Sequence, residues 1–408
     1  MRIVSRIIRL VWGGDVDRAL RPVLAVSLAG SIANSAAYTY LGIWAIKELQ
    51  AGQGLLGTAY LAGAVLGGAI GYLAGHWSDH IGRRPLILVG WGLQATVPLL
   101  LLATGHHVDE GLLLIALLPV FGSLGGAADQ AMVADLVAPE RQEAAYASVR
   151  VASNLGVTIG PPIGGLLLIG THWPHLWLGT FVLATAGFAI AWRYIPSGGA
   201  YAPEEAPTRG SLGVILRDRP FQLFLLFAVL AAATYQTTET LLPISVTTTH
   251  HLPPSLWGFL MILNPLFVTV FQLRLTRRVA HIPPTVKLAL AMPMMGVPFV
   301  LLNVNGSAGA VALIVIVFVT GEMLWIPTAQ AVVSRLAPAD IRGAYMGAYS
   351  GAFAIGNAAT PFLGLQIRAA FGDKTMWLCV AGLGVLAGAL GYAAARGRDS
   401  DAAIASPA

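Results

Sequence analysis

The sequence has few charged residues and a single cysteine. Charged residues make up 11% of the 408 residues, less than half of the roughly 25% found in an average soluble protein. Cys379 is alone, which excludes an intramolecular disulfide, a cysteine metal cluster and a CxxC redox motif. The net charge of +5 does not indicate nucleic-acid binding, because no solvated domain clusters lysine and arginine. Paired aspartate clusters are also missing, so a lipid or prenyl transferase is not predicted.

The sequence contains many long apolar segments. The chain is 56% hydrophobic, and a helix needs about 20 mostly apolar residues to cross about 30 Å of hydrocarbon. Twelve such spans are predicted, at 22–46, 54–76, 85–104, 111–137, 144–170, 174–195, 220–246, 255–275, 285–303, 308–334, 343–368 and 375–395. We therefore predict an all-α integral membrane protein that needs no cofactor.

The basic residues are distributed unequally between the two ends of these spans. Of the 24 lysines and arginines, 20 lie on the side of the termini, Arg150 lies inside a span, and Lys47, Arg368 and Lys374 lie on the opposite side. The positive-inside rule places both termini in the cytoplasm, with the protein in a plasma membrane of the bacterial inner-membrane type. Within residues 1–21, Arg2, Arg6 and Arg9 alternate with Ile3, Ile7 and Ile8. This pattern predicts an interfacial segment rather than a cleaved signal.

The longest predicted connector divides the chain into two similar halves. Residues 196–219 are rich in glycine, proline and charge, which is typical of a linker. It separates predicted bundles at 22–195 and 220–395, and a cytoplasmic tail follows at 396–408.

Sequence matches across this linker indicate a repeat. Pro139, Ala145 and Tyr146 recur 199 positions later, and Gly156, Pro161 and Gly164 recur 200 positions later. A repeat of this length predicts two pseudo-symmetric six-helix bundles that enclose a central cavity.

The connector between the second and third predicted spans reads G-H-W-S-D-H-I-G-R-R-P, Gly75 to Pro85. Gly82 permits a sharp reversal of the chain, and Asp79 offers an acid to neighbouring arginines or to a helix N-terminus. The positive-inside rule explains the arginines but requires neither the acid nor the glycine spacing. The pattern resembles the loop after the second span of Major Facilitator Superfamily transporters, in which it latches the cytoplasmic side. The resemblance implies a major facilitator fold and a cytoplasmic gate made of Gly75, Asp79, Gly82, Arg83, Arg84, Asp135 and Arg141.

The fifth predicted span contains G-V-T-I-G-P-P-I-G-G, Gly156 to Gly165. Its prolines remove backbone donors and are expected to kink the helix, and its glycines let another helix approach closely. Packing alone accounts for part of this pattern. The full pattern also resembles the fifth-span motif of the antiporter branches of the superfamily, especially drug:proton antiporters. The motif residues are Gly156, Gly160, Pro161, Pro162, Gly164 and Gly165.

Four ionisable residues fall inside predicted spans: Asp129, Arg150, Glu239 and Glu322. Each costs a few kcal/mol at the bilayer centre, so each is a candidate for proton coupling. Asp129 and Arg150 lie at similar predicted depths on adjacent spans, where they could form either a gating pair or a structural pair. Glu322 has no base nearby on its own span and is expected near the midplane, where it could hold a proton when secluded. A hydrogen-bonded structural acid is the alternative for Glu322, and solvation at a span end is the alternative for Glu239.

Polar side chains in the spans are candidates for contacts with a substrate. Ser31, Asn34 and Tyr38 share one helical face. In the family that the chain resembles, the first, fourth, seventh and tenth spans line the cavity. Tyr235, Gln236, Asn264 and Trp325 are further candidates. Polar residues of this kind also bond one helix to another, which is the structural alternative.

The sequence therefore predicts a monomeric, proton-driven antiporter that exports small lipophilic or cationic molecules by alternating access. Its predicted partners are a small-molecule substrate, protons and the lipid bilayer. A metabolite symporter or uniporter of the same superfamily is the first alternative. A membrane sensor that does not transport is the second, although the termini are too short for a signalling domain.

Overall fold

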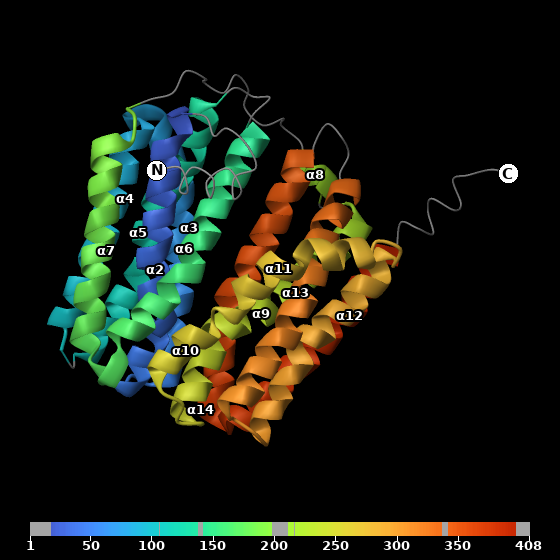
Figure 1. Ribbon diagram of the computed structural model, residues 1–408. Coiled ribbons are helices and arrows are strands. Elements are labelled where there is room, and N and C mark those ends of the chain that lie inside the picture. Colours follow the sequence, from blue (N-terminus) through green and yellow to red (C-terminus); the bar gives the residue numbers. More distant parts are fainter. Residues whose placement is uncertain are drawn as a thin grey trace. The chain divides into compact units, whose positions relative to one another are not determined.

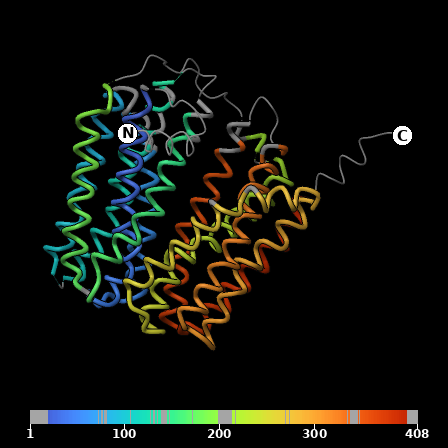
Figure 2. The backbone as a smooth tube through the Cα atoms, in the orientation of Figure 1, coloured from blue at the N-terminus to red at the C-terminus, as the bar shows by residue number. Residues whose placement is uncertain are grey.

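The structure is a computed structural model. It describes residues 18–105, 107–137, 142–197, 211–215, 217–336 and 342–396, which contain helices and no strand (Figure 1 and Figure 2). The chain divides into two compact units. The first comprises the residues up to Glu205 together with Pro253–Ile262, and the second comprises Ala206–Leu252 and the residues from Leu263 onwards.

The first unit is a bundle of long helices. Its elements are η1 (Arg18–Leu20), α2 (Arg21–Lys47), α3 (Gln53–Ile81), α4 (Arg83–Ala103), α5 (Val108–Leu136), α6 (Gln142–Leu167), η3 (Ile169–Thr171), α7 (Trp173–Tyr194) and the short α10 (Pro254–Leu260). The long helices run side by side in Figure 1. Helix α2 packs on both α6 and α7, while α3 and α4 each pack on α5.

The second unit repeats this organisation. Its elements are α8 (Ser211–Ile215), α9 (Arg219–Thr248), α11 (Leu263–Arg278), α12 (Pro284–Gly296), η4 (Val297–Asn303), α13 (Ala308–Leu336) and α14 (Arg342–Arg396). Helix α9 packs on α14 and α12 packs on α13. Helix α14 is divided by a non-helical glycine, Gly372, whose φ is +82°.

Nine segments within the described ranges are long and apolar enough to cross a membrane, as judged by length and composition. One of them lies in α14, which Gly372 divides in two. Helices α2 and α6 are also long enough to span, with 27 and 26 residues, but they are richer in polar side chains. The arrangement is consistent with the twelve predicted crossings.

The glycines of α6 form a seam with α2, as their spacing predicts. A Cβ atom on Gly160 would lie 2.6 Å from the Ile32 carbonyl oxygen, and one on Gly164 would lie 2.5 Å from that of Ala36. The Tyr40 hydroxyl donates to the Pro161 carbonyl at 2.7 Å. Only glycine permits this approach, because any larger residue would overlap the backbone of α2.

The first half of α14 makes the corresponding seam with α9. A Cβ atom on Gly356 would meet the backbone of Val229 and Ala233, and one on Gly364 would meet the Leu241 side chain. The Thr360 hydroxyl donates to the Ala233 carbonyl at 3.0 Å. The repeat seen in the sequence is therefore a repeat of packing.

The connector predicted at Gly75–Pro85 is shorter than the sequence pattern indicates. Helix α3 continues to Ile81 and α4 begins at Arg83, so Gly82 alone separates them. Its φ of +95° lies in the region that favours glycine. The predicted reversal at Gly82 is confirmed. The prediction of an eleven-residue loop was wrong, because polar residues can extend a helix beyond its apolar part.

The predicted continuous span at 255–275 is interrupted. Helix α10 ends at Leu260, and α11 begins at Leu263. Pro265 lacks an N–H and its ring crowds the carbonyl of Met261, so a helix cannot continue undisturbed through this point. The interruption leaves α10 packed on α6 within the first unit, where a Cβ atom on Gly165 would lie 2.8 Å from the Ser255 carbonyl oxygen.

Candidate functional site

The second unit buries Glu322 on α13 beside an amide from another helix. The Asn264 side chain on α11 donates to Glu322 Oε2 at 2.7 Å. The Glu322 side chain is 7% exposed, and no ion pair to it is found among the residues that the structure describes. The sequence predicted both residues as site residues, but it contained no signal that would pair them across 58 positions.

Glu239 on α9 brings a second acid near Glu322, close enough for the two charges to interact. Glu239 is partly exposed, as is its neighbour Gln236 one turn earlier. The structure therefore gathers Glu239, Asn264 and Glu322 from α9, α11 and α13.

Two residues of an aromatic cluster, Tyr235 and Trp325, lie about one turn from these acids on α9 and α13. The Trp325 ring stacks on Phe353 with centroids 5.9 Å apart and planes at 10°. The Tyr235 ring lies 5.9 Å from Trp325 and 6.3 Å from Phe353. Trp325 is completely buried. In this structure Trp325 therefore packs within the cluster and offers no open surface to a substrate, although it was predicted to line the cavity.

The first unit contains a cavity of about 360 Å³. Ser31 and Asn34, which were predicted to face a substrate, line it. Asn34 also lines an adjoining smaller pocket, together with Tyr38. The helical face predicted from the spacing of these three residues therefore borders empty space.

Other polar residues of this cavity were missed from the sequence. They are Ser27 of α2, Gln94 of α4, and Tyr146 and Ser153 of α6. Ser27 and Ser153 are joined by a hydrogen bond of 2.7 Å between their hydroxyls. Ser27 lies one turn before Ser31, so its position could have been inferred from helical spacing. The contributions of α4 and α6 depend on which helices are neighbours.

Asp129 of α5 lies in the wall of the same cavity and is hydrogen-bonded by the Trp91 side chain of α4. Its hypothesised partner Arg150 is exposed, and no ion pair joins the two among the described residues. An indole N–H from an adjacent helix thus takes the place predicted for the guanidinium. Asp129 is the acid among the described residues that line this cavity.

The predicted gate residues are described in part. The Arg83 Nε donates to Asp135 Oδ2 at 3.1 Å, and both side chains are largely buried. Arg84 instead donates to the Trp192 carbonyl at 2.6 Å. Arg141 and the side chain of Asp79 lie outside the described residues, so their predicted contributions to the gate stay predictions.

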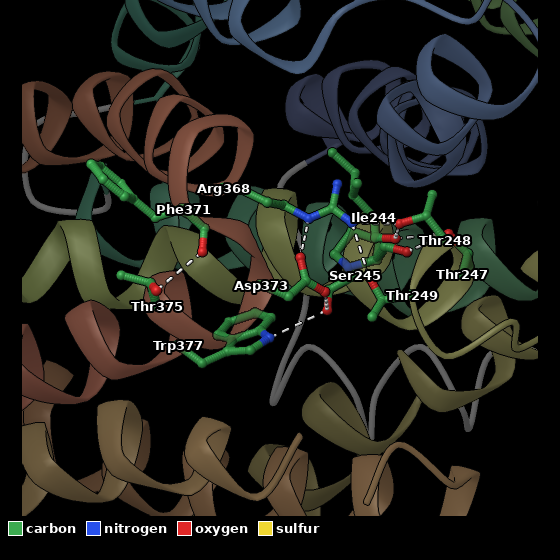
Figure 3. A network of polar contacts seen from close by, with 11 residues as sticks. Ile244, Ser245, Thr247, Thr248, Thr249, Arg368, Phe371, Asp373, Thr375 and Trp377 are labelled. Atoms are coloured by element: carbon green, nitrogen blue, oxygen red, sulfur yellow. Dashed lines mark hydrogen bonds and ion pairs between the residues drawn. The ribbon is translucent and has the colours of Figure 1, made fainter. Parts of the chain in front are cut away.

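A second polar network ties the far end of α9 to the kink of α14 (Figure 3). Arg368 forms an ion pair with Asp373 and donates to Thr248 at 2.7 Å and to Thr249 at 3.0 Å. Asp373 also accepts from Ser245 at 2.6 Å. Arg368 is only 7% exposed, so this network is buried within the second unit.

Sequence comparison assigns the family. A profile described as Major Facilitator Superfamily matches residues 23–361. The chain belongs to the Major Facilitator Superfamily. It is therefore a multi-pass membrane transporter with the fold that its sequence predicts.

Two individual relatives share a quarter or less of their residues with this chain over the matched regions. A Na⁺, Li⁺, K⁺/H⁺ antiporter of Planococcus maritimus is 23% identical over 383 residues, which cover 86% of this chain and 89% of that protein. A sugar efflux transporter A of Dickeya chrysanthemi is 25% identical over 43% of this chain and 45% of that protein.

Solved structures of the same fold include transporters of different substrates. A nucleoside transporter has a TM-score of 0.76 at 12% identity, and the match covers 92% of this chain and 100% of the other. A bacterial homologue of the lysosomal transporter Spinster has a TM-score of 0.75 at 12% identity, with coverage of 93% and 96%. At these identities the likeness establishes the fold alone.

Proposed function

We propose that this transporter is a proton-coupled antiporter that exports a small cationic or lipophilic molecule, and that Glu322 carries the coupling proton. The observation that supports this proposal most is the buried contact between Glu322 and Asn264. A carboxylate in the membrane interior costs a few kcal/mol, and here its described partner is a neutral amide 2.7 Å away. Protonation removes that cost, so occlusion of the site and protonation of the acid are coupled.

The proton then moves in the opposite direction to the cargo. Glu322 accepts a proton when the site faces one side of the membrane and releases it when the site faces the other. Asn264 positions the carboxyl group in both forms, because its amide can donate to a carboxylate and accept from a carboxylic acid. Glu239 adds a second negative charge that disfavours the doubly ionised pair.

In this proposal the cargo binds in the cavity of the first unit. Its volume of about 360 Å³ falls within the roughly 300–1,000 Å³ typical of small-molecule sites. Asp129 supplies one negative charge, while hydroxyl and amide groups of Ser27, Ser31 and Asn34 supply neutral hydrogen bonds. This lining suits an amine or another organic cation with a few polar groups.

A metal cation is the second candidate cargo, because the relative from Planococcus maritimus exchanges Na⁺, Li⁺ and K⁺ for protons and matches 86% of this chain. Within the described residues, no three histidine, cysteine, aspartate or glutamate side chains gather in one place. A cavity with one carboxylate among its described lining residues favours the organic cation, which needs a single counter-charge.

Transport into proteoliposomes with an imposed pH gradient tests the proposal. A panel of cationic dyes, neutral amphiphiles, Na⁺ and K⁺ identifies the cargo, and the direction of movement distinguishes antiport from symport. Glu322→Gln is expected to abolish accumulation driven by the gradient while exchange of cargo for cargo continues. Glu110→Gln is the matched control, because Glu110 is an exposed acid on α5. If Glu322→Gln follows the gradient like the wild type, Glu322 is not the coupling acid.

The variant Asp129→Asn distinguishes the proposed role of Asp129 in binding the cargo from the proposed role of Glu322 in proton coupling. Loss of a charge-assisted hydrogen bond is worth about 1.5–3 kcal/mol, or roughly tenfold or more in affinity. We therefore expect the KM of a cationic cargo to rise at least about tenfold, while the response to the pH gradient is retained. An unchanged KM for every cation would remove Asp129 from the cargo site.

A further inference from the structure

The second unit contains a basic cavity that the proposed transport cycle does not use. It has a volume of about 250 Å³ and lies between α11, α12 and α13. Thr276 of α11, Lys287 of α12, and Thr328 and Arg335 of α13 line it. Helix α11 ends, α12 begins and α13 ends at this end of the unit, so the cavity lies close to one boundary of the membrane.

The charge in this cavity has one sign. Lys287 and Arg335 are its charged lining residues, and no acid is among the described residues that line it. The Arg335 Nε donates to the carbonyl of Ala331 on its own helix, at 3.4 Å. Neither residue forms an ion pair within the part of the chain that the structure describes. Among the described residues, the cavity therefore presents two positive charges without a counter-charge.

The donors around the cavity match a phosphate group. Lysine and arginine donate charged hydrogen bonds, and the hydroxyls of Thr276 and Thr328 lie in the same lining. Pro284, near the N-terminus of α12, also lines it, so the exposed backbone N–H groups and the helix dipole add positive potential.

Two of the helices that line the cavity also carry exposed apolar side chains. Phe271 and Val270 of α11 are 41% and 43% exposed, and Leu290 of α12 is 53% exposed. In a membrane protein such exposed apolar residues face hydrocarbon. A ligand with both a phosphate and acyl chains would place each part against a matching surface.

We propose that this cavity binds a phosphate group, and that an anionic phospholipid supplies it. The head group lies between Lys287 and Arg335, and the acyl chains lie along the exposed apolar residues of α11 and α12. Free phosphate has the same head-group chemistry but gains no binding energy from the exposed apolar residues of α11 and α12.

Binding can be measured on the purified full chain by native mass spectrometry and by thermal unfolding in detergent. The probes are phosphatidylglycerol, phosphatidylcholine, inorganic phosphate and glycerol 1-phosphate. A ligand that binds only the folded state raises the Tm, and at a fixed concentration a tighter ligand raises it more. We expect phosphatidylglycerol to bind and to raise the Tm, and the other three probes to have little effect.

Two double variants locate the site. In Lys287→Gln with Arg335→Gln, the affinity for phosphatidylglycerol is expected to fall about 10- to 30-fold, because each basic residue contributes about fivefold at an anionic membrane surface. Arg277→Gln with Arg278→Gln is the matched control, since these residues of α11 carry the same charge but do not line the cavity.

Each outcome decides one part of the proposal. An equal loss of affinity in both double variants would show general surface attraction and would overturn the site. Equal binding of phosphatidylcholine would remove the requirement for a net anion. If inorganic phosphate raises the Tm as much as phosphatidylglycerol does, the phosphate site is retained, but the proposal that a lipid supplies the phosphate is overturned. Because transport is not the readout, these outcomes are independent of the proposed function.

Discussion

The connection between α6 and α7 in the first unit and the kink of α14 in the second occupy equivalent positions in the repeat, but different interactions stabilise them. Each is called a helical corner below. With the offset of 200 positions, Leu168, Trp173 and Trp177 of the first unit correspond to Arg368, Asp373 and Trp377 of the second. The first set is apolar and buried, and the Trp44 ring meets Trp177 edge-on at 5.4 Å. The second set is a buried ion pair, and the Trp377 indole donates to Ser245 at 3.3 Å.

The difference shows that one helical corner can be stabilised by apolar burial or by paired charge. Apolar burial needs no partner of defined chemistry. A buried ion pair depends on both members, because removal of one leaves an uncompensated charge. The corner of the second unit is therefore expected to be far more sensitive to single substitutions.

Arg368→Leu should have the largest effect. It introduces the residue type found at position 168 but leaves Asp373 buried without its cation. We expect a loss of about 3–5 kcal/mol in the free energy of unfolding, measured by denaturant titration in detergent. Arg368→Leu combined with Asp373→Leu should recover most of this loss. A double variant as unstable as the single one would show that charge pairing does not hold this corner.

The two helix seams provide a second comparison. Gly160→Ala should cost about 1–3 kcal/mol, because the added methyl group meets the backbone of Ile32 and Ala36. Gly364→Ala should cost less than about 1 kcal/mol, because the obstructing Leu241 atoms belong to a side chain that can move. Unfolding free energies of both variants test this order. Equal losses would mean that the seam of the first unit is not the tighter one.

The third comparison is between a hydrogen bond to a buried acid and an exposed hydrogen bond, and it includes the smallest expected effect. Asn264→Ala removes the amide donor of Glu322 and should cost about 1.5–3 kcal/mol, with a matching loss of coupled transport. Asn303→Ala removes an exposed amide hydrogen bond and should change stability by no more than about 0.5 kcal/mol. Similar values for the two variants would indicate that Asn264 does not support Glu322.

Local sequence patterns account for the parts of the fold and site that could be predicted. The spacing of Ser31, Asn34 and Tyr38 is enough to place them on one helical face, because the helix period is a local property. The glycines of α6 likewise predict a close helix contact. The interruption before Pro265 and the extension of α3 to Ile81 were missed, because the apolar length of a segment does not reveal where its backbone bonds are broken or continued.

Pairings between helices could not be predicted in the same way. Asp129 and Arg150 were predicted at similar depths, yet the described partner of Asp129 is Trp91. Glu322 is bonded by Asn264, which the sequence marked only as a candidate substrate contact. Depth in the membrane restricts which residues can meet, but the rotation of each helix decides which of them do.

The sequence by itself determined that this chain is a membrane transporter built from two repeated helical halves, because apolar length, charge asymmetry and repeated glycines are all recorded along the chain. The tertiary structure alone decided which polar residues gather around Glu322, Asp129 and Arg368, and where empty space remains between the helices. The physical reason is that spans of similar apolarity carry no local signal for their lateral neighbours or for their rotation. Packing selects both.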